Sequence, residues 1–188
     1  MKFNRNKLPF LIIIVILFNL ISCENEEDKK EILYKVYIDN PTQNKYTIFI
    51  NGQKNKIKPK TNEIFELEEG EYHFKGLNDK QQDIFEENVK VDTTILINIA
   101  QQNYYLVSEI YSDDKSIYKR IKLDTIEING QTLIGLFKKL PANKFFYKRE
   151  WQYEMNDSMP QNLPFSKDYR AYSKLVREKD LISYYLRQ

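Results

Sequence analysis

The chain has 188 residues, with 29 Lys and Arg against 27 Asp and Glu, and it contains one cysteine and one histidine. A single cysteine cannot form a disulfide within the chain, and Cys23 and His73 together cannot supply the ligands of a Cys/His zinc site. The 14 Tyr and 11 Phe suit half-buried strands, so the composition predicts a mainly β fold.

The first 22 residues combine basic residues with an apolar run. Lys2, Arg5 and Lys7 precede the apolar stretch 8–21. This arrangement is typical of a secretory signal peptide. The apolar stretch is also shorter than the roughly 20 residues that a transmembrane helix needs. We therefore expect residues 1–22 to be a helical signal segment that is removed.

The end of this segment carries a short motif. Leu20-Ile21-Ser22-Cys23 resembles the lipobox of bacterial lipoproteins, in which a small residue precedes the cysteine. The resemblance implies lipidation of Cys23 and cleavage before it, so the membrane itself becomes the first partner. Several buried acyl chains, at about 0.8 kcal/mol per CH₂, would anchor the protein firmly. The alternative is a free cysteine after a plain signal peptide or an uncleaved anchor.

Residues 23–32 form an acidic segment that includes "ENEEDKK". Its low hydrophobicity is typical of a solvated tether. It also resembles the acidic tags that direct some lipoproteins to the outer face of the bacterial outer membrane. We therefore expect an outer-membrane location, with surface exposure slightly favoured over the periplasmic face.

The charge balance changes once residues 1–22 are set aside. The remainder has 26 basic and 27 acidic residues, a net charge of −1, which disfavours nucleic acid as a partner. Residues 24–110 have a net charge of −6 and residues 111–188 a net charge of +5. This asymmetry favours two complementary lobes, and a basic face for an anionic partner is the alternative.

The pattern of residues 33–110 predicts short strands separated by turns. Apolar residues lie on both faces of the first strand, which ends at Pro41. Asn51-Gly52 joins two strands and predicts a type I′ hairpin. A second hairpin is expected around Glu69-Gly70, and Ile95, Ile97 and Ile99 alternate in a later strand. The pattern predicts an antiparallel β-sandwich domain.

Two stretches of this domain resemble a known kind of module. Ile50-Asn51-Gly52 and the segment from Leu67 to Tyr72, "LEEGEY", are similar to the hairpins of small immunoglobulin-like or PEGA-type β-sandwich modules in bacterial envelope proteins. The resemblance implies a scaffold or binding role, and no catalytic residue carries over from it.

Residues 111–188 are expected to form a β-rich (α+β) lobe packed on the first domain. Asp113-Asp114 predicts a turn, and Asn129-Gly130 predicts a second type I′ hairpin. Near the end, a strand through Val176 is followed by a short helix with Asp180 as its N-cap.

One segment of this lobe has the composition of a binding surface. It interleaves aromatic and basic side chains at Tyr147, Lys148, Arg149, Trp151 and Tyr153. Aromatic residues and Arg are enriched at binding hot spots. The alternative is that these large rings fill the core of the lobe. The sequence suggests no catalytic residues, no metal ligands and no cofactor.

These patterns favour a non-enzymatic binding or scaffold module of the cell envelope, with a protein or glycan as its ligand. A small hydrolase is a second hypothesis and would need two carboxylates in one cleft. An accessory or immunity-type lipoprotein with one cognate protein is a third.

Replacing Cys23 by Ala should release the protein from the membrane, because no other residue can carry the lipid. We expect wild-type protein to incorporate labelled palmitate and to sediment with membranes, and the Cys23→Ala variant to do neither. Protease treatment of intact cells should remove the wild-type protein if it lies on the surface. Membrane-bound Cys23→Ala protein would contradict the lipobox hypothesis.

Overall fold

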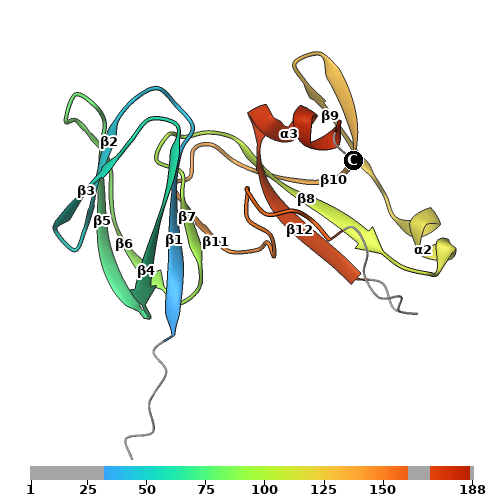
Figure 1. The fold of residues 1–188 in the computed structure, drawn as a ribbon, viewed down its shortest axis with the longest axis horizontal. Coiled ribbons are helices and arrows are strands. Elements are labelled where there is room, and N and C mark those ends of the chain that lie inside the picture. The colour runs from blue at the N-terminus through green and yellow to red at the C-terminus, as the bar shows by residue number, and fades with distance from the viewer. Residues whose placement is uncertain (1–31, 161–169, 187–188) are drawn as a thin grey trace, which may run out of the picture. The chain divides into compact units, whose positions relative to one another are not determined.

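The computed structural model describes residues 32–160 and 170–186, and most of these residues lie in strands (Figure 1). This confirms the predicted mainly β fold. The β1 sheet contains, in order, β11 (Phe146–Lys148), β7 (Ile95–Ile97), β1 (Leu33–Asn40) and β4 (Thr61–Glu68). The β2 sheet contains β3 (Gln53–Ile57), β2 (Tyr46–Ile50), β5 (Gly70–Leu77) and β6 (Asp83–Val91). The β8 sheet contains β12 (Arg170–Arg177), β8 (Tyr104–Tyr111), β10 (Gln131–Leu140) and β9 (Asp124–Ile128).

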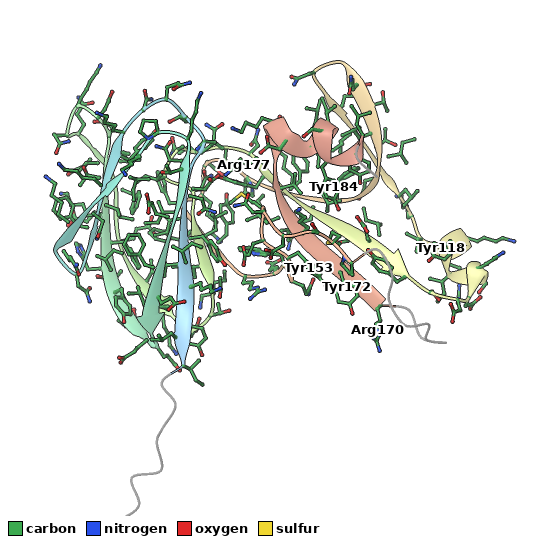
Figure 2. All side chains as sticks on the ribbon, viewed as in Figure 1. Tyr118, Tyr153, Arg170, Tyr172, Arg177 and Tyr184 are labelled. Carbon is green, nitrogen blue, oxygen red and sulfur yellow. The ribbon has the colours of Figure 1, made fainter. Side chains whose placement is uncertain are left out.

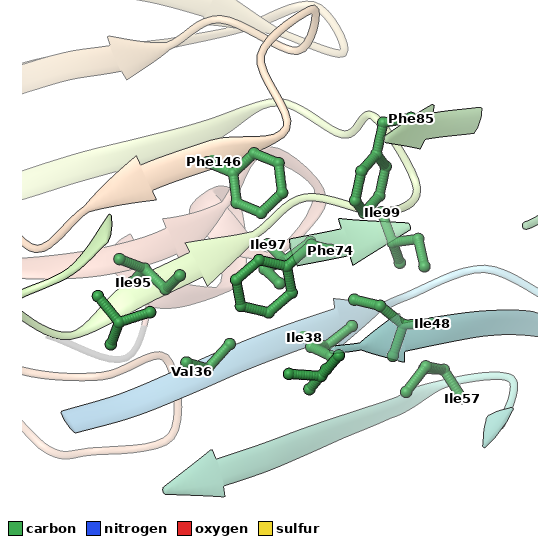
Figure 3. Packing of buried hydrophobic residues seen from close by; sticks show 12 residues of the cluster. Val36, Ile38, Ile48, Ile57, Phe74, Phe85, Ile95, Ile97, Ile99 and Phe146 are labelled. Carbon is green, nitrogen blue, oxygen red and sulfur yellow. The ribbon is translucent and has the colours of Figure 1, made fainter. Parts of the chain in front are cut away.

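The centre of the β1 sheet, formed by β7 and the second half of β1, is buried on both faces. Val36 and Ile38 of β1 pack in one apolar cluster with side chains of the β2 sheet (Figure 3). Tyr37, between them, packs in a second cluster with Leu106 and Leu175 of the β8 sheet. Because successive side chains of a strand point to opposite faces, both faces of β1 must be apolar. This explains the apolar residues on both sides of the first predicted strand.

Both Asn-Gly hairpins are confirmed. Asn51 and Gly52 have φ values of 48° and 81°, and Asn129 and Gly130 have values of 51° and 76°. A type I′ turn needs positive φ at both central positions, which Asn and Gly tolerate best. β2 pairs with β3 and β9 pairs with β10 across these turns.

The hairpin predicted around Glu69-Gly70 is wrong. β4 pairs with β1, whereas β5 pairs with β2 and β6, so the chain passes from one sheet to another at Glu69. Neither of these two residues has a positive φ, so the turn geometry of a tight hairpin is absent. Phe65 and Phe74 still reach the same apolar cluster, from opposite sheets.

Sheet membership does not follow the division expected after residue 110. β8 begins at Tyr104 but pairs with β10 and β12. β11, from the second predicted lobe, pairs with β7 in the β1 sheet (Figure 1). Phe146 of β11 packs in the same cluster as Val36. The β1 sheet is therefore completed by a strand from the later part of the chain.

Two helices differ from the sequence prediction. α2 (Lys115–Arg120) was not predicted and follows directly on Asp113-Asp114, where a turn was expected; the Asp114 carboxylate caps it by accepting the Ser116 N–H at 2.8 Å. α3 (Glu178–Tyr185) begins before Asp180, which lies in its first turn, and Arg177 occupies the N-cap position. The acidic first turn of α3 suits the positive end of the helix dipole.

A buried ion pair connects the β1 and β8 sheets. Asp39 of β1 is fully buried, and its carboxylate accepts two hydrogen bonds from Arg177 at 2.6 and 2.7 Å. The Tyr104 hydroxyl donates a third at 2.7 Å. The hydrogen bonds to Asp39 raise the pKa of Arg177, and burial raises that of Tyr104. Arg177 also lies 3.2 Å from Asp180 of α3.

Replacing Arg177 by Met should be strongly destabilising, because it leaves the Asp39 carboxylate buried without a cation. We expect a loss of about 3–5 kcal/mol in the free energy of unfolding. The double variant Asp39→Leu/Arg177→Met should lose less. Arg120→Met is the control, since its ion pair with Asp114 is exposed and should cost at most about 1 kcal/mol. Urea unfolding measures all of these values, and equal losses for Arg177→Met and Arg120→Met would contradict the assignment.

Candidate functional site

A groove of about 900 Å³ lies on one face of the β8 sheet. It is lined by side chains of β8 and β12, by α3 and by residues 155–160. The pairing of Tyr172 with Glu109 places the odd-numbered residues of β8 and the even-numbered residues of β12 on the same face. Glu109, Tyr111 and Lys174 therefore point to the same side. We call this hollow the Glu109 groove.

Two tyrosine hydroxyls hold the Glu109 carboxylate. Tyr111 donates to Oε2 at 2.5 Å, and Tyr184 of α3 donates to Oε1 at 2.6 Å. Burial raises the pKa of both tyrosines, and the hydrogen bonds to Glu109 raise it further. Burial also raises the pKa of neighbouring Tyr185 to about 12, with the negative charge of Glu109 adding to it. Hydrogen bonds to an ionised acceptor are short and strong, so they fix Glu109 in place.

Lys174 brings an ammonium group into the same groove. The residue is only 8% exposed, and its Nζ donates to the backbone carbonyl of Asp157. The Nζ atom also lies 5.3 Å from the centre of the Tyr184 ring, within cation–π range. Burial lowers the pKa of Lys174, and the negative charges of Asp157 and Glu109 oppose that shift.

Two further tyrosines, Tyr172 of β12 and Tyr153, form a chain of ring contacts with Tyr111 of the groove. Tyr172 packs edge-on against Tyr111 and against Tyr153, with ring centres 5.9 and 5.8 Å apart. Figure 2 labels Tyr153 and Tyr172 beside each other. Residues 152–153 are tied to the edge of β12 by hydrogen bonds to Ser173 and Leu175. The aromatic rings are therefore held by both packing and backbone pairing.

The predicted aromatic surface is not one surface in the structure. Tyr147 and Trp151 are buried in the cluster that joins the β1 and β8 sheets. Trp151 donates its indole N–H to Glu154 at 2.9 Å, and burial raises the pKa of Glu154. Tyr153 lies beside Tyr172 instead. The rings are therefore divided between the core and the groove side of β12.

The two basic residues of the same segment also have partners. Lys148 lies 2.6 Å from Asp92, and Arg149 donates to the carbonyls of Trp151 and Gln152 at 2.6 and 2.8 Å. These contacts shape the local chain after β11. They leave neither cation facing the Glu109 groove.

Sequence reasoning missed the residues that line the groove. Glu109 and Lys174 each interrupt an apolar strand, in "YYLVSEIY" and "RAYSKLVR". A charged residue in such a strand indicates a site, because a buried charge needs a partner. One partner of Glu109, Tyr111, lies in β8 itself. The other partners, Tyr184 of α3 and the carbonyl of Asp157, belong to segments that no local pattern connects to β8 or β12.

The described residues contain no group of three or more His, Cys, Asp or Glu side chains that could hold a metal ion. His73 is about half exposed and lies 3.1 Å from Glu86 on the β2 sheet. Within residues 32–160 and 170–186, no helix is long and apolar enough to cross a membrane.

The fold and groove define a mainly β protein with a polar, tyrosine-lined concavity. Comparison with family models, with curated proteins and with solved structures gave no match.

Replacing Tyr184 by Phe should weaken the loss of stability at high pH. The pKa of Tyr184 is raised in the folded chain, so the unfolded chain releases this proton first above about pH 10, and the free energy of unfolding falls as the pH rises. Without the hydroxyl, the fall should be shallower by up to about 1.4 kcal/mol per pH unit. Urea unfolding between about pH 9 and 12 measures the slope. An unchanged slope would contradict the raised pKa.

Proposed function

We propose that this protein is a lipid-anchored protein of the bacterial outer membrane that binds a protein or glycan partner without catalysing a reaction. The observation that carries the binding role is the Glu109 groove, where fixed tyrosines, a carboxylate and an ammonium group line one concavity. Concave sites with a few fixed polar groups are typical of ligand binding.

The anchoring part of the proposal is based on sequence. Leu20–Cys23 and most of the acidic segment 23–32 lie outside the described residues. The lipobox resemblance supports attachment through Cys23, and "ENEEDKK" supports display on the cell surface. The immunoglobulin-like or PEGA-type resemblance of the first domain adds support for a scaffold or binding role.

The contacts of the groove favour binding over turnover. Asp157 accepts the backbone N–H of Glu154 at 2.8 Å, and Asp180 pairs with Arg177 at 3.2 Å. With Glu109 held by two hydroxyls, each carboxylate of the groove has a structural partner. Pre-positioned charges and rings bind a ligand at low cost in side-chain entropy.

A small hydrolase is the second candidate, because three carboxylates, Glu109, Asp157 and Asp180, line the same groove. A glycosidase needs two such groups about 5–10 Å apart around the bond to be cut. Release of reducing ends from a glycan by wild-type protein, lost in Glu109→Gln, would establish this function. An immunity-type role predicts instead one tight protein partner.

Filling the groove should abolish binding there. Ser183 of α3 lines the groove and is exposed, so Ser183→Trp should place an indole in it without disturbing the core. Lys179→Trp is the control, because Lys179 is exposed on the same helix but lies outside the groove. The measurement uses arrays of immobilised glycans and purified envelope proteins. We expect the affinity for a bound partner to fall at least tenfold in Ser183→Trp and to stay unchanged in Lys179→Trp.

Two results would contradict this proposal. One is a partner that Ser183→Trp and Lys179→Trp bind equally well. The other is the absence of any wild-type binding on both arrays.

A further inference from the structure

A second hollow, of about 440 Å³, lies beside strand β11. It is lined by residues 87–90 of β6, by β11 itself, and by apolar side chains that include Leu106, Leu140 and Trp151. Its lining therefore comes from all three sheets. We call it the β11 pocket.

β11 is an edge strand of the β1 sheet, and its pairing fixes which backbone groups are unpaired. Two backbone hydrogen bonds flank the pairing of β11 with β7. The Asn98 N–H donates to the Phe145 carbonyl at 2.7 Å, and the Arg149 N–H donates to the Thr94 carbonyl at 2.9 Å. In an antiparallel pair, alternate residues bond to the partner strand. The N–H and C=O groups of Phe146 and Lys148 therefore point away from β7. Among the described strands β11 pairs with β7 alone.

Edge strands are commonly protected by a lysine, a proline or a bulge. Lys148 does not serve this purpose here, because Asp92 holds its ammonium group at 2.6 Å. The Tyr147 hydroxyl is likewise turned to the carbonyl of Pro141. The outward edge of β11 thus borders the pocket, whose lining includes Phe146, Lys148 and several apolar side chains.

Two charges at the pocket have no ion-pair partner among the described residues. These are Lys144, before β11, whose Nζ lies 5.6 Å from the centre of the Tyr147 ring, and Glu87 of β6. The other charged side chains of the lining are paired: Lys148 with Asp92, Lys90 with Glu69, and Glu150 with Lys138. A ligand with one acidic and one basic residue would supply the ion-pair partners of these two charges.

We propose that the β11 pocket binds an extended segment of a partner protein, which adds as a fifth strand to the β1 sheet beside β11. Phe146 and Lys148 would supply up to four backbone hydrogen bonds, and alternate side chains of the segment would face the apolar lining. Lys144 and Glu87 would select its charged residues. This interaction goes beyond the proposed function, because it uses none of the Glu109 groove.

The test is a displayed library of twelve-residue peptides selected on the wild-type protein. Lys148→Pro removes the outward N–H and places a ring at the edge, without removing a bond to β7. Lys148→Ala is the matched control, because it loses the ammonium group but keeps the N–H. We expect selected peptides to bind Lys148→Pro at least tenfold more weakly than Lys148→Ala.

Two further measurements use the wild-type protein, so they do not depend on whether Lys148→Pro folds. N-methylation of alternate peptide nitrogens should abolish binding, since it removes the strand-pairing donors. Binding of the unmodified peptide should slow hydrogen exchange at the amides of Phe146 and Lys148. Ser183→Trp should bind the peptide normally, which separates this site from the groove.

The proposal is overturned if the library yields no binder, if N-methylated peptides bind as well as unmodified ones, or if the slowed amides lie outside β11. Equal binding by folded Lys148→Pro and Lys148→Ala overturns it too, as does a peptide that Ser183→Trp no longer binds.

Discussion

The Asp39 carboxylate is fully buried, and its burial is tolerable only because Arg177 and Tyr104 surround it with three hydrogen-bond donors. A buried carboxylate without a cation would favour another packing of the sheets. Arg177 stands between β12 and α3 and also contacts Asp180. One ion pair thus connects the β1 sheet, the β8 sheet and the first turn of α3. The position of α3 in turn sets one side of the Glu109 groove.

The β1 sheet lies between the other two sheets, because its central strands have apolar side chains on both faces. All three residues of β7 are buried, and the rings of Phe146 and Tyr147 enter different clusters. The central strands are covered on both faces, so at the β11 side the sheet can meet a partner chain only through its edge. The open edge at β11 is therefore a direct consequence of the layer order, and it lies next to a pocket that supplies apolar contacts.

The two hollows offer different chemistry. The Glu109 groove presents side chains: tyrosine rings, a carboxylate and a desolvated ammonium group held by mutual contacts. The β11 pocket presents backbone donors and acceptors beside apolar side chains. Both are built on strands that are fixed by packing, so either could bind a ligand with little rearrangement.

Local sequence determined the features that depend on neighbouring residues. Asn51-Gly52 and Asn129-Gly130 specify their hairpins, because few residues tolerate positive φ. The high Tyr and Phe content specified the β class. Local sequence could not show that β4 and β5 lie in different sheets, nor that Trp151 is buried, because both depend on contacts between distant segments. The same holds for the Glu109 groove: Tyr184 and Glu109 are 75 residues apart, and only the packing of α3 on β8 brings the hydroxyl to the carboxylate.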